Sequence, residues 1–149
     1  MLYLRHLEAT FKYWIGRLVF RRRCKMLNWV DDRLAITDLA GVTLVDDLRK
    51  QGVEFVIDVR VHFHPHHILG EEYPDKTIWK FANDILTLSE RAKVVVHCIG
   101  GMDRSPFVAM LYYKLKHGCD YREAYDHIKK ARPQTIEHWE WVEEVKYFK

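Results

Sequence analysis

The order of strand-like and helix-like segments from Asn28 onward constrains the fold of this chain most. The apolar, β-branched runs that predict strands are Arg33–Thr37, Val53–Val61 and Val94–Val96. Helices are expected over Val42–Lys50, Asp75–Ser89 and 106–117, and then from Asp120 and from about Thr135. Residues 62–74 match neither period, so we expect an irregular loop there. Strands that alternate with helices favour a central, mainly parallel sheet flanked by helices, so the predicted fold class is α/β.

Local signals place several of these boundaries. Asp120, with Glu123 three residues later, is a capping-box pattern and predicts the start of a helix. Gly52 ends the helix that precedes it, because glycine readily takes the conformation that terminates a helix. Arg132-Pro133 separates the last two helices, since a residue before proline disfavours the helical conformation.

The first 27 residues differ from the rest of the chain. Residues 1–25 hold seven Lys or Arg and a single acid, Glu8, and their apolar residues recur at helical spacing. We therefore expect a basic amphipathic N-terminal helix over residues 1–27, followed by one compact domain over residues 28–149. Two interpretations of the helix stay open. It packs on the domain with its basic end in water, or residues 1–25 make peripheral contact with an anionic membrane or partner.

Composition narrows the class of protein. The 149 residues carry a net charge of +3, a mild basic balance that suits an anionic substrate. Cys24, Cys98 and Cys119 are odd in number and widely spaced, which argues against a disulfide framework and a CxxC metal site. We expect a reduced, cytoplasmic setting, with neither a transmembrane segment nor a secretory leader. Beyond residue 25 the sequence has no stripe of basic and aromatic residues, so we expect no nucleic-acid partner.

One segment carries the chemistry: His97-Cys98-Ile99-Gly100-Gly101-Met102-Asp103-Arg104-Ser105. It lies between a predicted buried strand and a predicted helix, where loop N–H groups converge at a helix N-terminus and make an anion site. Gly100 and Gly101 let the backbone approach an oxyanion closely. The same field favours the thiolate form of Cys98, which is its nucleophilic form. Arg104 offers a planar fork that can hold two phosphoryl oxygens at once.

This stretch matches the HCxxGxxR[ST] loop residue for residue. The chain thereby resembles the cysteine-based protein tyrosine phosphatase superfamily, and most of all its small dual-specificity type. The segments "DDRLAIT", "GVEFVIDVR", "VVVHC" and "ARPQ" follow that family's element order from about residue 28 to the C-terminus. The resemblance implies a dual-specificity phosphatase-like fold and the hydrolysis of phosphate monoesters.

The resemblance also implies a role for each loop residue. Cys98 attacks phosphorus to give a phosphocysteine, which water then hydrolyses without a metal or any other cofactor. Ser105 hydrogen-bonds the departing sulfur, and His97 orients the loop. The residues that bind the substrate are Ile99, Gly100, Gly101, Met102, Asp103 and Arg104. The expected substrate is a phosphorylated protein, and the alternative is a phospholipid head group.

The proton donor for the leaving group is the open question of the site. Asp75 is the nearest match to the acid that the family carries on a loop, but it also stands where a helix N-cap is expected. Asp103 resembles the loop aspartate of myotubularin lipid phosphatases and certain bacterial secreted phosphatases, which use it as the acid. Glu71 and Glu72 lie on the same loop as Asp75 and stay open as candidates. For Asp58, at the end of a predicted strand, we expect a structural role.

A cluster of histidines raises a separate question. His62, His64, His66 and His67 crowd one loop, but their spacing is not that of a known ligand set, so we expect no metal. A pocket rim that becomes more cationic below neutral pH is the favoured interpretation. Two classes of protein other than a phosphatase stay open as alternatives. A rhodanese-type sulfurtransferase has a shorter interval between cysteine and arginine, and a non-catalytic phosphate-binding module usually lacks one of the two.

Overall fold

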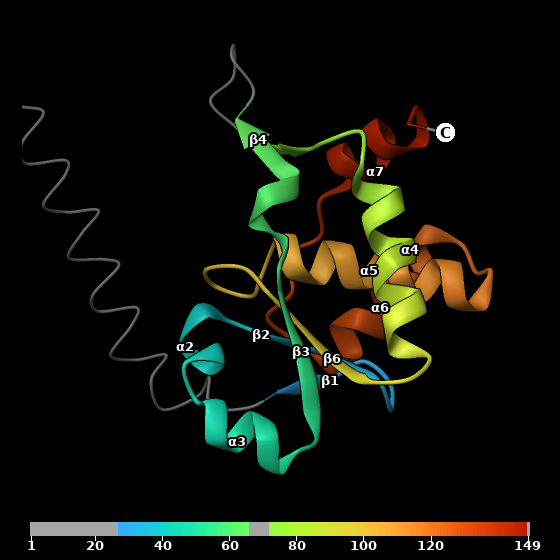
Figure 1. Ribbon diagram of the computed structural model, residues 1–149. Helices are drawn as coiled ribbons and strands as arrows, with labels where there is room; N and C mark the ends of the chain where they lie inside the picture. The colour runs from blue at the N-terminus through green and yellow to red at the C-terminus, as the bar shows by residue number, and fades with distance from the viewer. Residues whose placement is uncertain (1–26, 66–71, 149) are drawn as a thin grey trace, which may run out of the picture.

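The computed structural model describes residues 27–65 and 72–148 and consists of a four-stranded sheet with helices on both faces (Figure 1). The strand order is β1-β2-β6-β3. The strands are β1 (Asn28–Trp29), β2 (Leu34–Thr37), β6 (Lys93–His97) and β3 (Val53–Asp58). β6 is parallel to both neighbours, whereas β1 is antiparallel to β2 at one edge. The predicted α/β class with a mainly parallel sheet is confirmed.

The register of the parallel strands brings their carboxyl ends to one edge of the sheet. Thr37 and Asp58 both pair with His97, the last residue of β6. The segments that leave this edge are therefore neighbours in space, although they are far apart in the sequence. In parallel sheets, binding sites form in such loops at the carboxyl ends.

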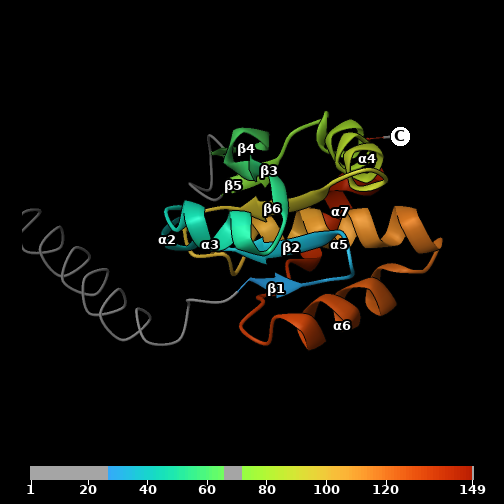
Figure 2. The ribbon, with the colours of Figure 1, turned by 60° about the horizontal axis from the view of Figure 1, so that its bottom comes forward.

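The helices divide between the two faces of the sheet (Figure 2). The short helices α2 (Leu39–Val42) and α3 (Val45–Lys50) cover one face, where Ala35, Leu48, Val53 and Val95 form a small apolar cluster. The other face carries the main core under α4 (Ile78–Ser89), α5 (Arg104–His117), α6 (Tyr121–Ala131) and α7 (Trp139–Lys146).

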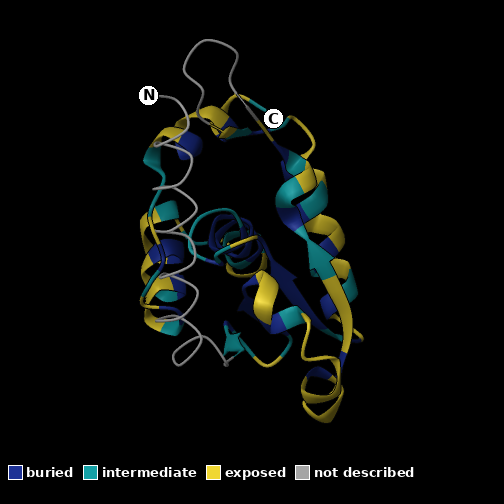
Figure 3. Ribbon diagram, turned by 90° about the vertical axis from the view of Figure 1, so that its left-hand side faces the viewer, coloured by how far each residue is buried: buried dark blue, intermediate teal, exposed yellow. Residues whose placement is uncertain are grey.

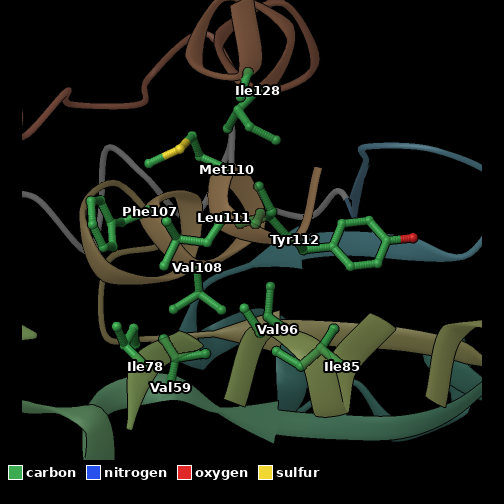
Figure 4. Close-up of a cluster of buried hydrophobic side chains, with 14 of the residues drawn as sticks. Val59, Ile78, Ile85, Val96, Phe107, Val108, Met110, Leu111, Tyr112 and Ile128 are labelled. Atoms are coloured by element: carbon green, nitrogen blue, oxygen red, sulfur yellow. The ribbon is translucent and has the colours of Figure 1, made fainter. Parts of the chain in front are cut away.

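Helix α5 runs through the middle of the main core. All of its residues from Ser105 to Tyr112 are buried, and buried residues gather at the centre of the molecule (Figure 3). Val108 points toward Val96 and Ile85, whereas Met110 lies on the side of Ile128 in α6 (Figure 4). A helix segment buried on all sides is packed on all sides, so the loop that precedes α5 leads directly into the main core.

The helix expected over Val42–Lys50 is instead two shorter helices. Asp38 starts α2 early because its side chain accepts a hydrogen bond of 2.7 Å from the N–H of Gly41. The hydroxyl of Thr43 then donates to the carbonyl of Ala40 and ends that helix. The chain restarts as α3 at Val45.

The strand expected over Val53–Val61 ends three residues early, at Asp58. The side chain of Asp58 accepts from the N–H of Arg60 and starts a 3-10 helix, η1 (Val59–His62). The expectation of a buried strand was also wrong for its middle, because β3 lies at the sheet edge. There Phe55 is 41% exposed and Val56 is 46% exposed.

The region expected to be an irregular loop contains two strands. β4 (Phe63–Pro65) and β5 (Glu72–Pro74) pair in antiparallel fashion, with His64 opposite Tyr73. Each strand has only three residues, too few to show the alternation that identifies a strand in a sequence. We call this pair the β4–β5 arm; residues 66–71 between its strands lie outside the described residues.

The remaining boundaries shift by a few residues. The helix expected from Asp75 begins at Ile78, that expected from 106 begins at Arg104, and that expected from about Thr135 begins at Trp139. Asp120 caps α6 as predicted and accepts 2.8 Å from the N–H of Glu123. The predicted N-terminal helix and Cys24 lie outside the described residues. Within the described ranges no helix has the length and apolar character to cross a membrane.

Candidate active site

The segment from Cys98 to Arg104, here called the phosphate loop, joins the carboxyl end of β6 to the N-terminus of α5. The Cys98 side chain is 2% exposed and lies at the start of the loop. The N–H of Gly101 points at its Sγ atom at 3.2 Å, and the hydroxyl of Ser105 lies 3.3 Å from the same atom. Both groups can donate to a thiolate, so the sequence-predicted nucleophile and Ser105 are brought together. Cys98 and Cys119 are both free thiols.

Three other segments hold the phosphate loop in place. The N–H of Leu39 donates to the carbonyl of Ile99 at 3.0 Å, and the N–H of Ile136 donates to the carbonyl of Met102 at 2.8 Å. The third support is Arg132, a side chain only 1% exposed, which donates to the carbonyl of Gly101 and to the side-chain oxygen of Asn28. These hydrogen bonds fix three backbone carbonyls of the loop and so hold its shape.

Gly101 has the conformation and the space that only glycine allows. Its φ is +63°, in the left-handed region, and a Cβ atom there would lie 2.7 Å from the carbonyl oxygen of Thr37. The glycine of the HCxxGxxR motif, Gly101, is therefore required by the close approach of the loop to the end of β2.

Arg104 faces a carboxylate of the β4–β5 arm. Its Nη1 atom lies 3.3 Å from Oε2 of Glu72, and its side chain is 17% exposed. The indole of Trp141 donates to the backbone carbonyl of Glu72 at 2.8 Å and fixes the arm against α7. Of the two glutamates considered from sequence, Glu72 is thus adjacent to the predicted phosphate clamp, while Glu71 lies outside the described residues.

Asp103 turns its side chain toward α7. Its Oδ1 atom lies 3.0 Å from Nε2 of His138, and the other ring nitrogen of His138 contacts the carboxylate of Glu140. The His138 ring stacks on Trp141 with centroids 3.8 Å apart. Burial opposes protonation, but the hydrogen bonds to Asp103 and Glu140 raise the pKa of His138 overall.

Asp75 lies at the start of α4 without being its N-cap, a position taken by Thr77. Asp75 accepts from the N–H and the hydroxyl of Thr77 at 2.8 and 2.6 Å, and lies 3.5 Å from His62 and 3.3 Å from His64. Burial acts in the opposite direction, but these contacts lower the pKa of Asp75. At neutral pH the group is a carboxylate that braces the entry to α4.

Asp58 has the structural role that its place at the end of a strand predicted. Asp58 binds the guanidinium of Arg60 through both oxygens and caps η1. The hydrogen bond from Arg60 lowers the pKa of Asp58 to about 2, against the effect of burial.

The described residues contain no group of three or more His, Cys, Asp or Glu side chains arranged for a metal ion. His62 and His64 face Asp75, and His66 and His67 fall outside the described ranges.

Sequence reasoning did not identify three residues that support the site. These residues are Arg132, which the sequence marks only as a helix boundary and as part of "ARPQ", and Trp141 and His138, which no motif marks. All three act through contacts with residues distant in the sequence. The one local signal for Arg132 is its place in the segment "ARPQ", which follows the family's element order.

Comparisons with known proteins identify the family of this chain. Residues 40–148 match the family model described as "Dual specificity phosphatase, catalytic domain". Dual specificity protein phosphatase MPK-4 of Drosophila melanogaster is 24% identical over 139 residues, which cover 83% of this chain and 36% of that protein. The chain thus spans little more than a third of the curated relative's length.

Solved structures share the fold. The crystal structure of Tk-PTP in the active form has a TM-score of 0.64 at 22% identity, covering 82% of this chain and 95% of the other. The crystal structure of PTPMT1 has a TM-score of 0.67 at 18% identity, covering 83% and 93%. A leucine-rich repeat and phosphatase domain protein from Entamoeba histolytica has a TM-score of 0.66 at 11% identity, covering 80% and 88%.

Proposed function

The chain belongs to the dual specificity phosphatase catalytic domain family and is a phosphatase of the protein-tyrosine/dual-specificity class; from this premise we propose that it hydrolyses phosphate monoesters through a phosphocysteine formed on Cys98. The observation that carries the proposal is the environment of the Cys98 sulfur. A loop N–H and the Ser105 hydroxyl point at it, and Arg104 stands at the start of the helix that follows.

In the first step the Cys98 thiolate attacks phosphorus, and the bond from phosphorus to the leaving oxygen breaks. Arg104 grips two phosphoryl oxygens, which stabilises the charge of the transition state. The backbone of the phosphate loop also binds the phosphoryl group, at Ile99, Gly100, Gly101 and Met102. Asp103 is the proposed proton donor to the leaving oxygen, in preference to Asp75, whose carboxylate is held by Thr77 and two histidines.

In the second step water attacks the phosphocysteine and the sulfur leaves as a thiolate. The Ser105 hydroxyl, 3.3 Å from Sγ, stabilises the negative charge that develops there. The proton released by water returns to the group that protonated the leaving oxygen, so the enzyme is restored. No step calls for a metal or another cofactor.

The proposed substrate is a phosphorylated protein, because the curated relative is a protein phosphatase by name. Exposed aliphatic side chains at the phosphate loop agree with an aromatic leaving group: Leu39 is 37% exposed, Ile99 38% and Ile136 47%. A phospholipid head group is the second candidate, favoured by the presence of Asp103 and by the basic residues 1–25.

The proposed location is the cytoplasm, and peripheral membrane contact through residues 1–25 is a separate proposal that follows from their charge. Sedimentation with vesicles that contain anionic lipid tests it. Binding by the full chain that is lost when residues 1–25 are removed supports membrane contact, whereas equal binding by both chains contradicts it.

Hydrolysis of an aryl phosphate tests the central proposal. We expect turnover by the wild type and its loss in Cys98→Ser and Arg104→Ala, with a phosphoprotein trapped by rapid acid quench in the wild type alone. Cys119→Ser is the matched control, because it removes the other described thiol and should keep full activity. Full activity in Cys98→Ser would contradict the proposal, and binding without turnover would identify a phosphate-binding module. Phosphopeptides and phosphoinositides, compared by kcat/KM, then separate the two substrate classes.

A further inference from the structure

The imidazole of His138 lies between two carboxylates supplied by different parts of the fold. Asp103 belongs to the phosphate loop and approaches Nε2 at 3.0 Å, while Glu140 belongs to α7 and contacts Nδ1. The ring is held flat against Trp141, with an interplanar angle of 12°. The backbone N–H of His138 donates to the phenol oxygen of Tyr125 at 3.1 Å. The ring therefore has a fixed position and a fixed orientation relative to Asp103.

The imidazole of His138 must be protonated to donate a hydrogen bond to both carboxylates. A neutral imidazole has one N–H and one lone pair, so it would turn a lone pair toward one of the two carboxylates. An imidazolium donates to both, and the two hydrogen bonds raise the pKa of His138 although burial opposes this. Tyr125, which faces the same residue from α6, stays neutral because burial strongly raises its pKa. The nearby guanidinium of Arg104 has its own carboxylate partner in Glu72.

The other candidate donors of the site lack such a stored proton. The pKa of Asp75 is lowered by its contacts, although burial acts the other way. Glu72 is ion-paired with Arg104. His138 differs, because burial opposes its protonation but its hydrogen bonds to two carboxylates raise its pKa overall. Its partner Asp103 directly precedes the phosphate clamp in the sequence.

We propose that His138 is a positioning residue that stores a proton for the phosphate loop and delivers it through Asp103. This inference rests on the proposed phosphocysteine chemistry and deepens it. As the bond from phosphorus to the leaving oxygen breaks, a proton passes from Nε2 of His138 to the Asp103 carboxyl group and from there to that oxygen. Water then attacks the phosphocysteine, and its proton passes through Asp103 back to His138. One proton leaves with the alcohol and one returns from water.

The test compares His138→Gln with the wild type on two substrates. Glutamine can still donate a hydrogen bond to Asp103 but cannot store a proton. We expect kcat for an alkyl phosphate, a poor leaving group, to fall about 100-fold, while kcat for a nitrophenyl phosphate changes little. For the wild type, alkyl phosphate turnover should fall as pH rises through the raised pKa of His138, and this decline should be absent in His138→Gln.

His127→Gln is the matched control. Like His138, His127 hydrogen-bonds through a ring nitrogen and stacks on an aromatic ring, but its partners are the Val30 carbonyl and Tyr113. It belongs to α6 and has no hydrogen bond to Asp103 or Arg104. It should leave both activities and the pH profile unchanged. If His138→Gln lowers both activities equally and keeps the pH profile, the contact only supports the loop and the inference is wrong. If it changes neither activity, the inference is wrong as well.

Proton NMR titration of the histidine Cε1–H signals separates this inference from the proposed function. The signal that is missing in His138→Gln should titrate above the usual value of 6.5 and should shift to lower pH in Asp103→Asn and in Glu140→Gln. A titration at or below that value overturns the inference even if the chain hydrolyses phosphate esters. A raised value together with an inactive wild type would instead contradict the proposed function.

Discussion

The carboxylate of Glu72 and the guanidinium of Arg104 form an ion pair with 3.3 Å between Oε2 and Nη1. The same guanidinium is the proposed clamp for the substrate, so a phosphoryl group must compete with Glu72 for it. The β4–β5 arm thereby brings a negative charge to the place where the negative charge of the substrate is to bind.

Glu72→Gln should therefore strengthen the binding of oxyanions. Glu72 is about half exposed, and a pair of this kind contributes under about 1 kcal/mol, so we expect the inhibition constant of orthovanadate to fall about threefold. Inhibition of aryl phosphate hydrolysis measures it. Glu143→Gln, which removes an exposed carboxylate paired with Lys146 on α7, is the control and should have no effect. Weaker vanadate binding in Glu72→Gln would show that the carboxylate assists binding.

Gly101→Ala should lower the stability of the protein. The new Cβ would meet the carbonyl oxygen of Thr37 at 2.7 Å and the guanidinium of Arg132 at 2.5 Å, and φ is +63°. Gly118→Ala is a close match in conformation, with φ of +65°, but nothing lies within 4 Å of its Cβ position. The control should lose about 1 kcal/mol from backbone strain alone, and Gly101→Ala about 2 kcal/mol more. Urea unfolding gives both values, and equal losses would contradict the role of the close approach.

Asp58→Asn should remove part of the pH dependence of stability. Arg60 lowers the pKa of Asp58 to about 2, against an ordinary value of 3.8. A lowered folded-state pKa stabilises the protein above the unfolded value, and this stabilisation is lost as pH falls through the folded value. The variant should therefore be less stable than the wild type by about 1 kcal/mol near neutral pH. The difference should vanish toward pH 2. Urea unfolding across this range measures it, and Asp84→Asn, in an exposed pair with Lys80, is the control.

Asp75→Asn should affect stability more than chemistry. The variant keeps an oxygen that accepts from Thr77 but loses the charge that faces His62 and His64, so we expect a loss of under about 1 kcal/mol. The ratio of kcat for nitrophenyl and alkyl phosphates should stay at the wild-type value. Asp103→Asn, measured beside it, should raise that ratio strongly because alkyl turnover falls. A raised ratio in Asp75→Asn instead would assign the proton donor to Asp75.

The parts of this molecule that could be predicted from sequence are those in which neighbours along the chain determine the structure. Val94–Val96 is a β-branched, apolar run and forms the middle of β6. The cap of α6 at Asp120 involves a residue only three positions away. The phosphate loop belongs to the same class, because its strand, its glycines and its helix are contiguous.

What could not be predicted depends on partners far along the chain. His138 reaches Asp103 across 35 residues, and no local pattern states that the two meet. The sequence could not distinguish Asp75 from Asp103 as proton donor, because each stands near the start of a helix and its contacts lie elsewhere in the chain. The β4–β5 arm was not predicted, because its three-residue strands are stabilised by pairing with each other and by the hydrogen bond from Trp141.

The anchoring of the phosphate loop by Arg132 bears on where this catalytic unit can be cut. The family match begins at residue 40. Yet Arg132, the residue that holds Gly101, is itself held by Asn28, and Gly101 lies against the carbonyl of Thr37. A fragment that starts at the family boundary would lose both β1 and β2, and with them the outer partner of this buried guanidinium. The smallest fragment able to keep its catalytic loop in shape therefore begins no later than Asn28.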